Sequence, residues 1–424
     1  MVYLGVFEAR DKWFTYFSQG DGGAHVSAEQ RKKLIVLMIN MFIAIGSFGI
    51  IIPILPAYLQ SIGQGGTAAG LMIAIFAGAQ LIFSPIAGKW TDQYGRRKMI
   101  IYGLVGLTAS MFIFYAVDTI WWLYFSRVIG GIGAALLVPA IFAYVADITT
   151  MEQRAKGNSL ISAAMSLGIV IGPGIGGFLT EYGLKVPFLI SAIVSLVAVI
   201  FSIIVLKESQ QEQAEGIHYD DESMVKKLVR SVKMPYFIPL VITLVMSFGL
   251  MSYESVLGLF VDNEFGATPQ EIALMITATG IISTIVQLFV VDRLVVNLGE
   301  EKVLNIFLGV ATVGFLLSIF ASSYVLFFGI TLIIFLATSI LRPVLNTLIS
   351  KLAGREQGFA MGMNNAYMSI GNILGPTLAG LLYDVNIIYP FVLGLILLLF
   401  TLMTTMIWVK RSPKQPKLGT PEKV

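Results

Sequence analysis

The chain has 424 residues, of which 56% are hydrophobic and only 12% are charged, and its mean hydropathy is +0.83. Soluble domains carry about 25% charged residues, so these charges are too few to cover a water-exposed surface and lipid is the expected solvent. The net charge of +3 does not indicate a nucleic-acid partner. Cysteine is absent and the two histidines, His25 and His218, lie in separate polar segments, so no metal site is expected.

Twelve apolar runs are long enough to cross a bilayer as helices, since a spanning helix needs about 20 residues. Together they predict an all-α membrane protein with twelve transmembrane helices. The runs lie at residues 34–59, 67–87, 99–117, 120–146, 157–180, 186–206, 235–261, 270–291, 303–320, 325–349, 358–383 and 387–409.

The basic residues indicate the orientation of these spans. All but three of the 28 Lys and Arg lie in the two tails or in the loops that follow the even-numbered spans. The exceptions are Lys185 in an alternate loop, and Arg127 and Arg342 inside spans. Because Lys and Arg collect on the cytosolic side, we expect a multi-pass protein of the cell membrane with both termini in the cytosol.

The charged segments divide the chain into five parts. Residues 1–33 form a cytosolic N-terminal segment without the apolar core and cleavage site of an ordinary signal peptide. Residues 34–206 form an N-terminal six-helix half, 207–234 a charged cytosolic linker, 235–409 a C-terminal six-helix half, and 410–424 a cytosolic tail.

An internal repeat relates the fifth and sixth spans to the eleventh and twelfth. The pattern A-x-M-S-x-G-x-x-x-G-P-x-x-x-G-x-L begins at Ala163 and again at Ala366, 203 residues later. A match across two spans predicts two pseudo-symmetric halves. Parallel six-span halves place a substrate site at their interface near the bilayer midplane, with access alternating by rocking, so the repeat favours transport.

The loop after the second span carries a charged motif. It resembles the G-x-x-x-D-[RK]-x-G-[RK]-[RK] element of the major facilitator superfamily, with Gln93 in place of a basic residue. The resemblance implies the major facilitator fold and a charge latch on the cytosolic face that holds the outward-open state. Gly88 would let two helices meet closely, and Asp92 would pair with basic groups or a helix end. The alternative is a plain basic loop required by topology. The gate residues are Gly88, Asp92, Gly95, Arg96 and Arg97.

The fifth span contains glycines at close spacing with one proline among them: Gly168, Gly172, Pro173 and Gly176. Such glycines strip one helix face of side chains and allow close contact, while the proline removes a backbone donor and bends the helix. The run resembles the G-x-x-x-G-P-x-x-G-G element of proton-coupled antiporters within the superfamily. A generic packing face is the alternative interpretation.

Three ionisable residues lie inside predicted spans: Arg127, Glu254 and Arg342. A charge within the bilayer is costly unless it is paired or hydrated, so each is a functional candidate. Glu254 lies at roughly the depth of Arg127, and its apolar neighbours disfavour the ionised carboxyl. It could therefore take a proton from outside and release it inward. The alternatives are an Arg127 side chain that snorkels to the outer interface, and a Glu254 that is permanently ion-paired or exposed near the outer mouth.

Three stretches resemble multidrug efflux pumps of the NorA and Bmr type: SFGLMSYES around Glu254, LRPVLN at 341–346 and GFAMGMNNAYMSIGNILGP at 358–376. The resemblance implies export of amphipathic, often cationic drugs in exchange for protons, without a cofactor. It assigns proton coupling to Glu254, with Arg127 and Arg342 as cationic companions. The residues expected to line the substrate cavity are Gln80, Phe335, Ser339, Asn372 and Tyr253.

Ser339 stands where such pumps can carry a second membrane aspartate, so Glu254 would have to carry the coupling alone. The sequence leaves open a transporter of the same architecture for one metabolite or lipid, such as a sugar, a polyamine or a glycolipid. Neither a receptor nor an enzyme is expected, because a receptor would need a signalling domain and an enzyme would need a nucleophile–base pair or a nucleotide-binding loop. The expected partners are small amphipathic drugs, protons and the bilayer, with the chain acting as a monomer.

Overall fold

The structure is a computed structural model that describes residues 27–209, 224–353 and 356–411. Within these ranges the ordered elements are all helices. Twelve of them are long, as predicted: α2 (Ala28–Ser61), α3 (Gly66–Tyr94), α4 (Arg96–Ala116), α5 (Ile120–Ile148), α6 (Met151–Leu179), α7 (Val186–Val205), α9 (Phe237–Phe265), α10 (Pro269–Phe289), α12 (Glu300–Ile319), α13 (Tyr324–Ala353), α14 (Gln357–Val385) and α15 (Tyr389–Arg411).

Eleven of the long helices are apolar enough over a sufficient length to cross a membrane. The twelfth, α14, has 29 residues but carries Asn364, Asn365 and Asn372, which lower its hydropathy. It packs against α9 of its own half and against α3 of the other half. Its composition, and not its length or position, therefore separates α14 from the other spans.

Several helix boundaries differ from those expected from hydropathy. Helix α2 begins at Ala28 because Ser27 forms a capping box with Gln30, whose backbone N donates to Ser27 Oγ at 3.1 Å. The eighth long helix ends at Phe289, and a separate helix α11 (Val291–Leu298) follows it. Helix α8 (Met224–Ser231) occupies part of the expected linker. Residues 1–26, 210–223 and 412–424 of the expected leader, linker and tail lie outside the described residues.

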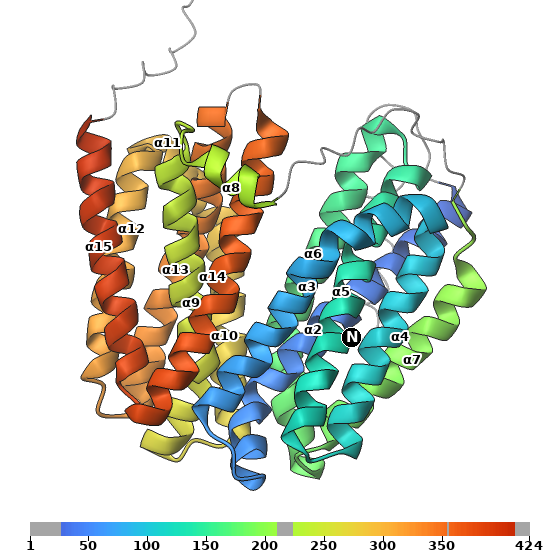
Figure 1. The fold of residues 1–424 in the computed structure, drawn as a ribbon, viewed down its shortest axis with the longest axis horizontal. Coiled ribbons are helices and arrows are strands. Elements are labelled where there is room, and N and C mark those ends of the chain that lie inside the picture. The colour runs from blue at the N-terminus through green and yellow to red at the C-terminus, as the bar shows by residue number, and fades with distance from the viewer. Residues whose placement is uncertain (1–26, 210–223, 354–355, 412–424) are drawn as a thin grey trace, which may run out of the picture.

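The long helices form two bundles, α2 to α7 and α9 to α15, that stand side by side (Figure 1). We call the end of the molecule with α8 and the end of α15 the linker face. The opposite end, with the α2–α3 and α14–α15 connectors, is the loop face. The bundles approach each other at the loop face and diverge toward the linker face (Figure 1).

The repeated glycines build the same helix pair in each half. A Cβ on Gly172 of α6 would lie 2.8 Å from the carbonyl oxygen of Gly46 in α2. A Cβ on Gly375 of α14 would lie 2.5 Å from the carbonyl oxygen of Phe248 in α9. Both distances are too short for a side chain, so these helices pack backbone against backbone. The two six-helix halves are thus pseudo-symmetric, as the repeat predicted.

Candidate functional site

Arg127 and Glu254 belong to opposite halves, and the structure places both on one cavity between the halves. The rest of its lining is mainly apolar and includes Phe48 of α2, Met72 of α3 and Leu259 of α9. The cavity volume is about 20 Å³. A water molecule needs roughly 10–15 Å³, so the cavity has room for about one water and none for a drug-sized molecule.

The Arg127 side chain is held within the protein. It is 2% exposed, its Nη2 donates to Ser110 Oγ at 2.9 Å, and its guanidinium lies 4.3 Å from the centre of the Phe114 ring. Its Nε has no hydrogen-bond partner, and no carboxylate of the described chain forms an ion pair with it. Contact with an aromatic face offsets part of the cost of burying a cation. Arg127 therefore does not snorkel to the outer interface.

Glu254 of α9 is half-buried, and within the described chain it accepts no hydrogen bond and forms no ion pair. Arg342 of α13 is exposed and near enough to act on Glu254 electrostatically, but the two form no salt bridge. A permanent ion pair between Glu254 and an arginine is thus absent from this conformation. The carboxyl instead faces a small cavity whose other charged residue is Arg127.

The predicted gate motif lies at the linker-face end of α3 and the start of α4. Arg96 contacts Asp92 at 3.2 Å and Asp147 at 2.9 Å, and Arg97 donates to the Ile203 carbonyl at 2.8 Å. All these partners belong to the N-terminal half. Gly95 adopts a φ of +100°, a left-handed conformation that favours glycine.

Gly88 departs from expectation. A Cβ at this position would meet nothing within 4 Å, so no helix packs closely against it here. The expected close contact is therefore wrong for this conformation. Gly88 belongs to the last two turns of α3 at the linker face, and the two bundles diverge toward this face (Figure 1).

The glycines of the predicted antiporter motif face α2. A Cβ would lie 2.9 Å from the Phe42 carbonyl oxygen if placed on Gly168, and 2.5 Å from the Ile50 carbonyl oxygen if placed on Gly176. Pro173, between them, approaches Gly49 of α2, where a Cβ would lie 3.0 Å from the proline Cδ. The motif therefore forms a continuous close contact between α6 and α2.

Four of the predicted substrate residues do not reach the Arg127–Glu254 cavity: Gln80, Phe335, Ser339 and Asn372. All four are half-buried. The Asn372 Oδ1 is buried without a hydrogen-bond partner. A buried amide oxygen without a partner is costly, which makes Asn372 the most unusual member of this set.

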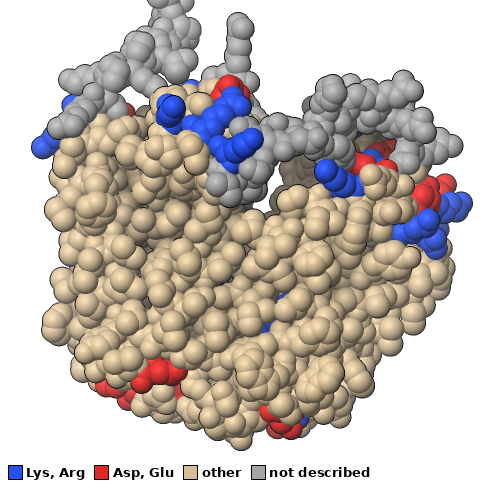
Figure 2. Space-filling model, viewed as in Figure 1, with Lys and Arg blue, Asp and Glu red and all other residues tan. Residues whose placement is uncertain are grey.

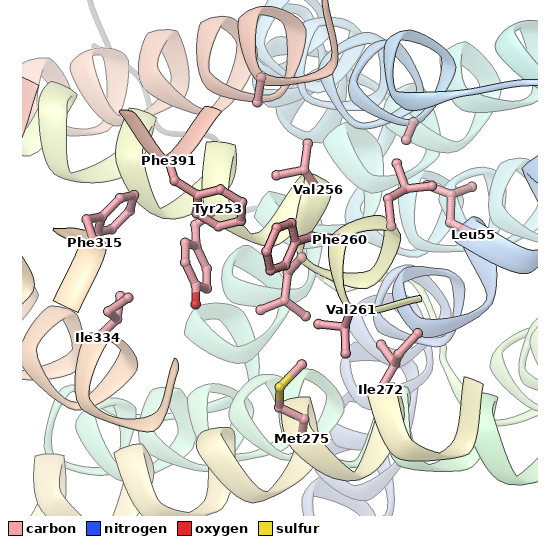
Figure 3. Packing of buried hydrophobic residues seen from close by; sticks show 14 of the residues in the cluster. Leu55, Tyr253, Val256, Phe260, Val261, Ile272, Met275, Phe315, Ile334 and Phe391 are labelled. Carbon is pink, nitrogen blue, oxygen red and sulfur yellow. The ribbon is translucent and has the colours of Figure 1, made fainter. Parts of the chain in front are cut away.

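Tyr253 requires a correction, because the structure places it in the core of the C-terminal half (Figure 3). It is 1% exposed, its hydroxyl is hydrogen-bonded to Thr331 Oγ1 at 2.7 Å, and its ring lies 5.2 Å from that of Phe315 and 5.5 Å from that of Phe391. Neighbouring residues on a helix point about 100° apart. Tyr253 therefore points into its own bundle, while Glu254 faces the cavity between the halves.

The polar contacts that join the halves at the loop face were not predicted from the sequence. Asp384 of α14 accepts hydrogen bonds from the backbone N of Gly66 and of Thr67 at the start of α3. Gln60 of α2 donates to Asp262 of α9 at 2.9 Å. Such partners are far apart in the chain, and no local pattern marks them.

The two ends of the molecule differ in shape. The surface shows a hollow between the halves at the linker face and is continuous at the loop face (Figure 2). The hydrogen bonds described between the halves, such as that from Gln270 Nε2 to Thr180 Oγ1 at 3.2 Å, lie at the loop face. The described conformation is therefore sealed at the loop face and open at the linker face.

Several known proteins are similar to this chain. Multidrug resistance protein 2 of Bacillus subtilis is 40% identical over 387 residues, covering 91% of this chain and 97% of that protein. Multidrug resistance protein 1 of the same organism is also 40% identical over 387 residues, covering 91% and 98%. The quinolone resistance protein NorA of Staphylococcus aureus is 33% identical over 359 residues, covering 85% and 92%.

Solved transporter structures share the fold. A bacterial homologue of the human lysosomal transporter Spinster superposes with a TM-score of 0.73 at 14% identity, covering 93% of this chain and 100% of that one. The nucleoside transporter NupG superposes with a TM-score of 0.71 at 14% identity, covering 90% and 100%. The sequence profile of the Major Facilitator Superfamily matches residues 37–260 and 239–424. The chain therefore belongs to the major facilitator superfamily.

Proposed function

We propose that this chain exports amphipathic, often cationic drugs from the cytosol in exchange for protons, by alternating access. The observation that carries the proposal is the cavity shared by Arg127 and Glu254, one residue from each half. Relatives named as multidrug and quinolone resistance proteins, which match most of the chain, support the substrate class. No resident cofactor is needed, because the proton gradient drives the exchange.

The orientation follows from charge. We place the linker face in the cytosol of a cell-membrane protein, because the basic residues gather in the loops and tails of that side. The described conformation then opens toward the cytosol, where it would receive substrate. The gate residues around Asp92 would close this side in the outward-open state, when the linker-face ends of the two halves meet.

The protonation state of Glu254 would change the attraction between the halves. An ionised Glu254 attracts the buried guanidinium of Arg127 across the cavity, whereas a protonated Glu254 does not. A cationic drug would compete with the proton for the same carboxyl. Each proton that enters gains about 2.3 kcal/mol per 100 mV of membrane potential. Arg342, exposed on α13, would be the second cationic companion of Glu254.

We extend the proposal to the remaining predicted site residues. Gln80, Phe335, Ser339 and Asn372 would line the drug path between the halves once it widens, since all four are half-buried in this conformation. The close α2–α6 contact through Gly172 would keep the N-terminal half rigid during rocking. We also propose that the chain works as a monomer and not as an enzyme.

The test is dye uptake into inside-out vesicles with an imposed pH gradient. We expect Glu254→Gln to lose gradient-driven uptake of a cationic dye by at least tenfold, because the amide cannot exchange a proton. Glu264→Gln is the matched control, because Glu264 is an exposed carboxylate on the same helix. Normal gradient-driven uptake by the Glu254→Gln protein would refute the coupling role. Uptake restricted to a single metabolite across a panel of compounds would favour the alternative transporter.

A further inference from the structure

The first turn of α3 is capped by a residue of the other half. The N-cap residue Gly65 has no side chain with which to cap the helix. Asp384, near the end of α14, accepts hydrogen bonds from Gly66 N at 2.7 Å and Thr67 N at 2.9 Å. It also accepts one from the Thr67 hydroxyl. One carboxylate of the C-terminal half thus satisfies the first amides of a helix in the N-terminal half.

A carboxylate suits this position for two reasons. The first amides of a helix have no partner within the helix, and the helix dipole makes this end partly positive. Hydrogen bonds from N–H groups to an ionised acceptor are also stronger than those between neutral groups. All of these interactions require the loop-face ends of α3 and α14 to touch. A rocking motion that opened the loop face would break them together.

Glycines leave the space that Asp384 occupies. A Cβ on Gly65 would lie 2.7 Å from Asp384 Oδ1. A Cβ on Gly66 would lie 2.7 Å from the Tyr383 ring and 3.1 Å from Asp384 Oδ1. The α3 start is therefore shaped to admit the end of α14.

The pseudo-symmetric position lacks this arrangement. Glu181 is the residue equivalent to Asp384 in the 203-residue repeat. It is exposed, with no hydrogen bond or ion pair described for it. The corresponding helix α10 caps itself, because Thr268 forms a capping box with Glu271, whose Oε2 accepts from Thr268 N at 2.8 Å. A charged cap between the halves is therefore present at one of the two equivalent places.

We propose that Asp384 and the N-terminus of α3 form a latch that holds the loop face closed while the linker face is open. This inference rests on the alternating access of the proposed function. The proposed gate residue Asp92 lies near the other end of α3. Helix α3 would thus carry one latch for each of the two conformations.

The latch can be tested by distance measurements between spin labels on the full chain, which has no cysteine of its own. One pair of introduced cysteines, at Ser61 and Ser322, reports on the loop face, and a second, at Lys98 and Lys302, reports on the linker face. All four residues are exposed, and each pair joins the two halves. We expect Asp384→Asn to raise the ratio of loop-face-open to loop-face-closed molecules by about three- to tenfold, since it weakens a charged cap.

Glu181→Gln is the matched control, because it removes a carboxylate from the equivalent place without touching the cap, and its distances should equal those of the parent. Distances for Asp384→Asn that equal those of the parent would overturn the latch. A second pair of variants tests the latch if the Asp384→Asn protein does not fold. Gly65→Ala should displace the carboxylate and open the loop face, whereas Gly78→Ala in the same helix adds a Cβ with no atom within 4 Å and should not.

These measurements need no substrate, so they separate the latch from the proposed function. Distances that shift in Asp384→Asn, together with Glu254→Gln vesicles that still take up dye, would support the latch and defeat the coupling role. Unshifted distances in Asp384→Asn, together with dye uptake lost in Glu254→Gln, would defeat the latch and support the coupling role.

Discussion

The two halves meet most extensively along two seams, α3 against α14 and α6 against α10, which the internal repeat relates to each other. At the first seam a Cβ on Gly70 would lie 2.0 Å from the Pro376 carbonyl oxygen, so backbone meets backbone. At the second, a Cβ on Gly177 would first meet the Ala273 methyl, at 2.2 Å. The first seam adds the charged Asp384 cap, while the second has the neutral bond between Gln270 and Thr180. The two seams thus pair equivalent helices but differ in the kind of contact they make.

This difference indicates that the two seams have different roles when the loop face opens. The first joins the halves through a charged cap and backbone contact, both of which fail abruptly when the helices part. The second joins them through a methyl group and a neutral hydrogen bond, which tolerate small movements better. We therefore expect the α3–α14 seam to control opening of the loop face.

The largest effect should come from filling the first seam. Gly70→Ala places a methyl against the Pro376 carbonyl, which belongs to a helix backbone and cannot move aside. We expect the free energy of unfolding in detergent to fall by about 1–3 kcal/mol, and the loop-face spin labels to move apart. Gly78→Ala, which adds a methyl in open space, is the control. A Gly70→Ala protein as stable as this control would show that the seam is not closely packed.

A smaller effect, which a second substitution should partly restore, is expected at the second seam. Gly177→Ala should lower the free energy of unfolding by about 1–2 kcal/mol, because the new methyl meets that of Ala273. Ala273→Gly in the same chain should restore part of this loss, as a double-mutant cycle would reveal. Strict additivity of the two changes would mean that the clash lies elsewhere, since the Pro269 carbonyl is also within 2.9 Å.

The smallest effect concerns an ion pair within one half. The Lys185 ammonium hydrogen-bonds to Asp118 at the loop face and holds the pKa of that carboxyl below its ordinary value. A lowered pKa stabilises the fold above the ordinary value near 4 and loses this contribution as the pH falls through the folded value. Lys185→Met should therefore cost about 0.2–0.5 kcal/mol at neutral pH, and this cost should shrink as the pH falls through the lowered pKa of Asp118.

Unfolding midpoints measured from pH 7 to pH 3 check this expectation. Because Asp118 and Lys185 both belong to the N-terminal half, their loss should leave the spin-label distances between halves unchanged. A shift in those distances, or a stability difference that does not shrink toward acid pH, would contradict it.

Hydropathy and the internal repeat were enough to predict twelve long helices and two halves, and the glycine spacing predicted a close contact for α6 without indicating that its partner is α2. These features depend on properties local to a helix: its apolar length, and the absence of side chains along one face, as at Gly168 and Gly172. The same rules placed the start of α2 six residues late, because apolar content does not mark the cap at Ser27. The apolar run at 358–383 also predicted α14, although three asparagines lower the hydropathy of this helix.

The directions of side chains and the contacts between halves were decided by the tertiary structure. Tyr253 and Glu254 are neighbours in sequence, yet one fills the core and the other faces the cavity, because helix rotation separates them. The juxtaposition of Arg127 with Glu254, the open space at Gly88 and the cap from Asp384 all depend on how the two halves are tilted. A sequence pattern within one helix does not record that tilt, since it arises from contacts between residues far apart in the chain.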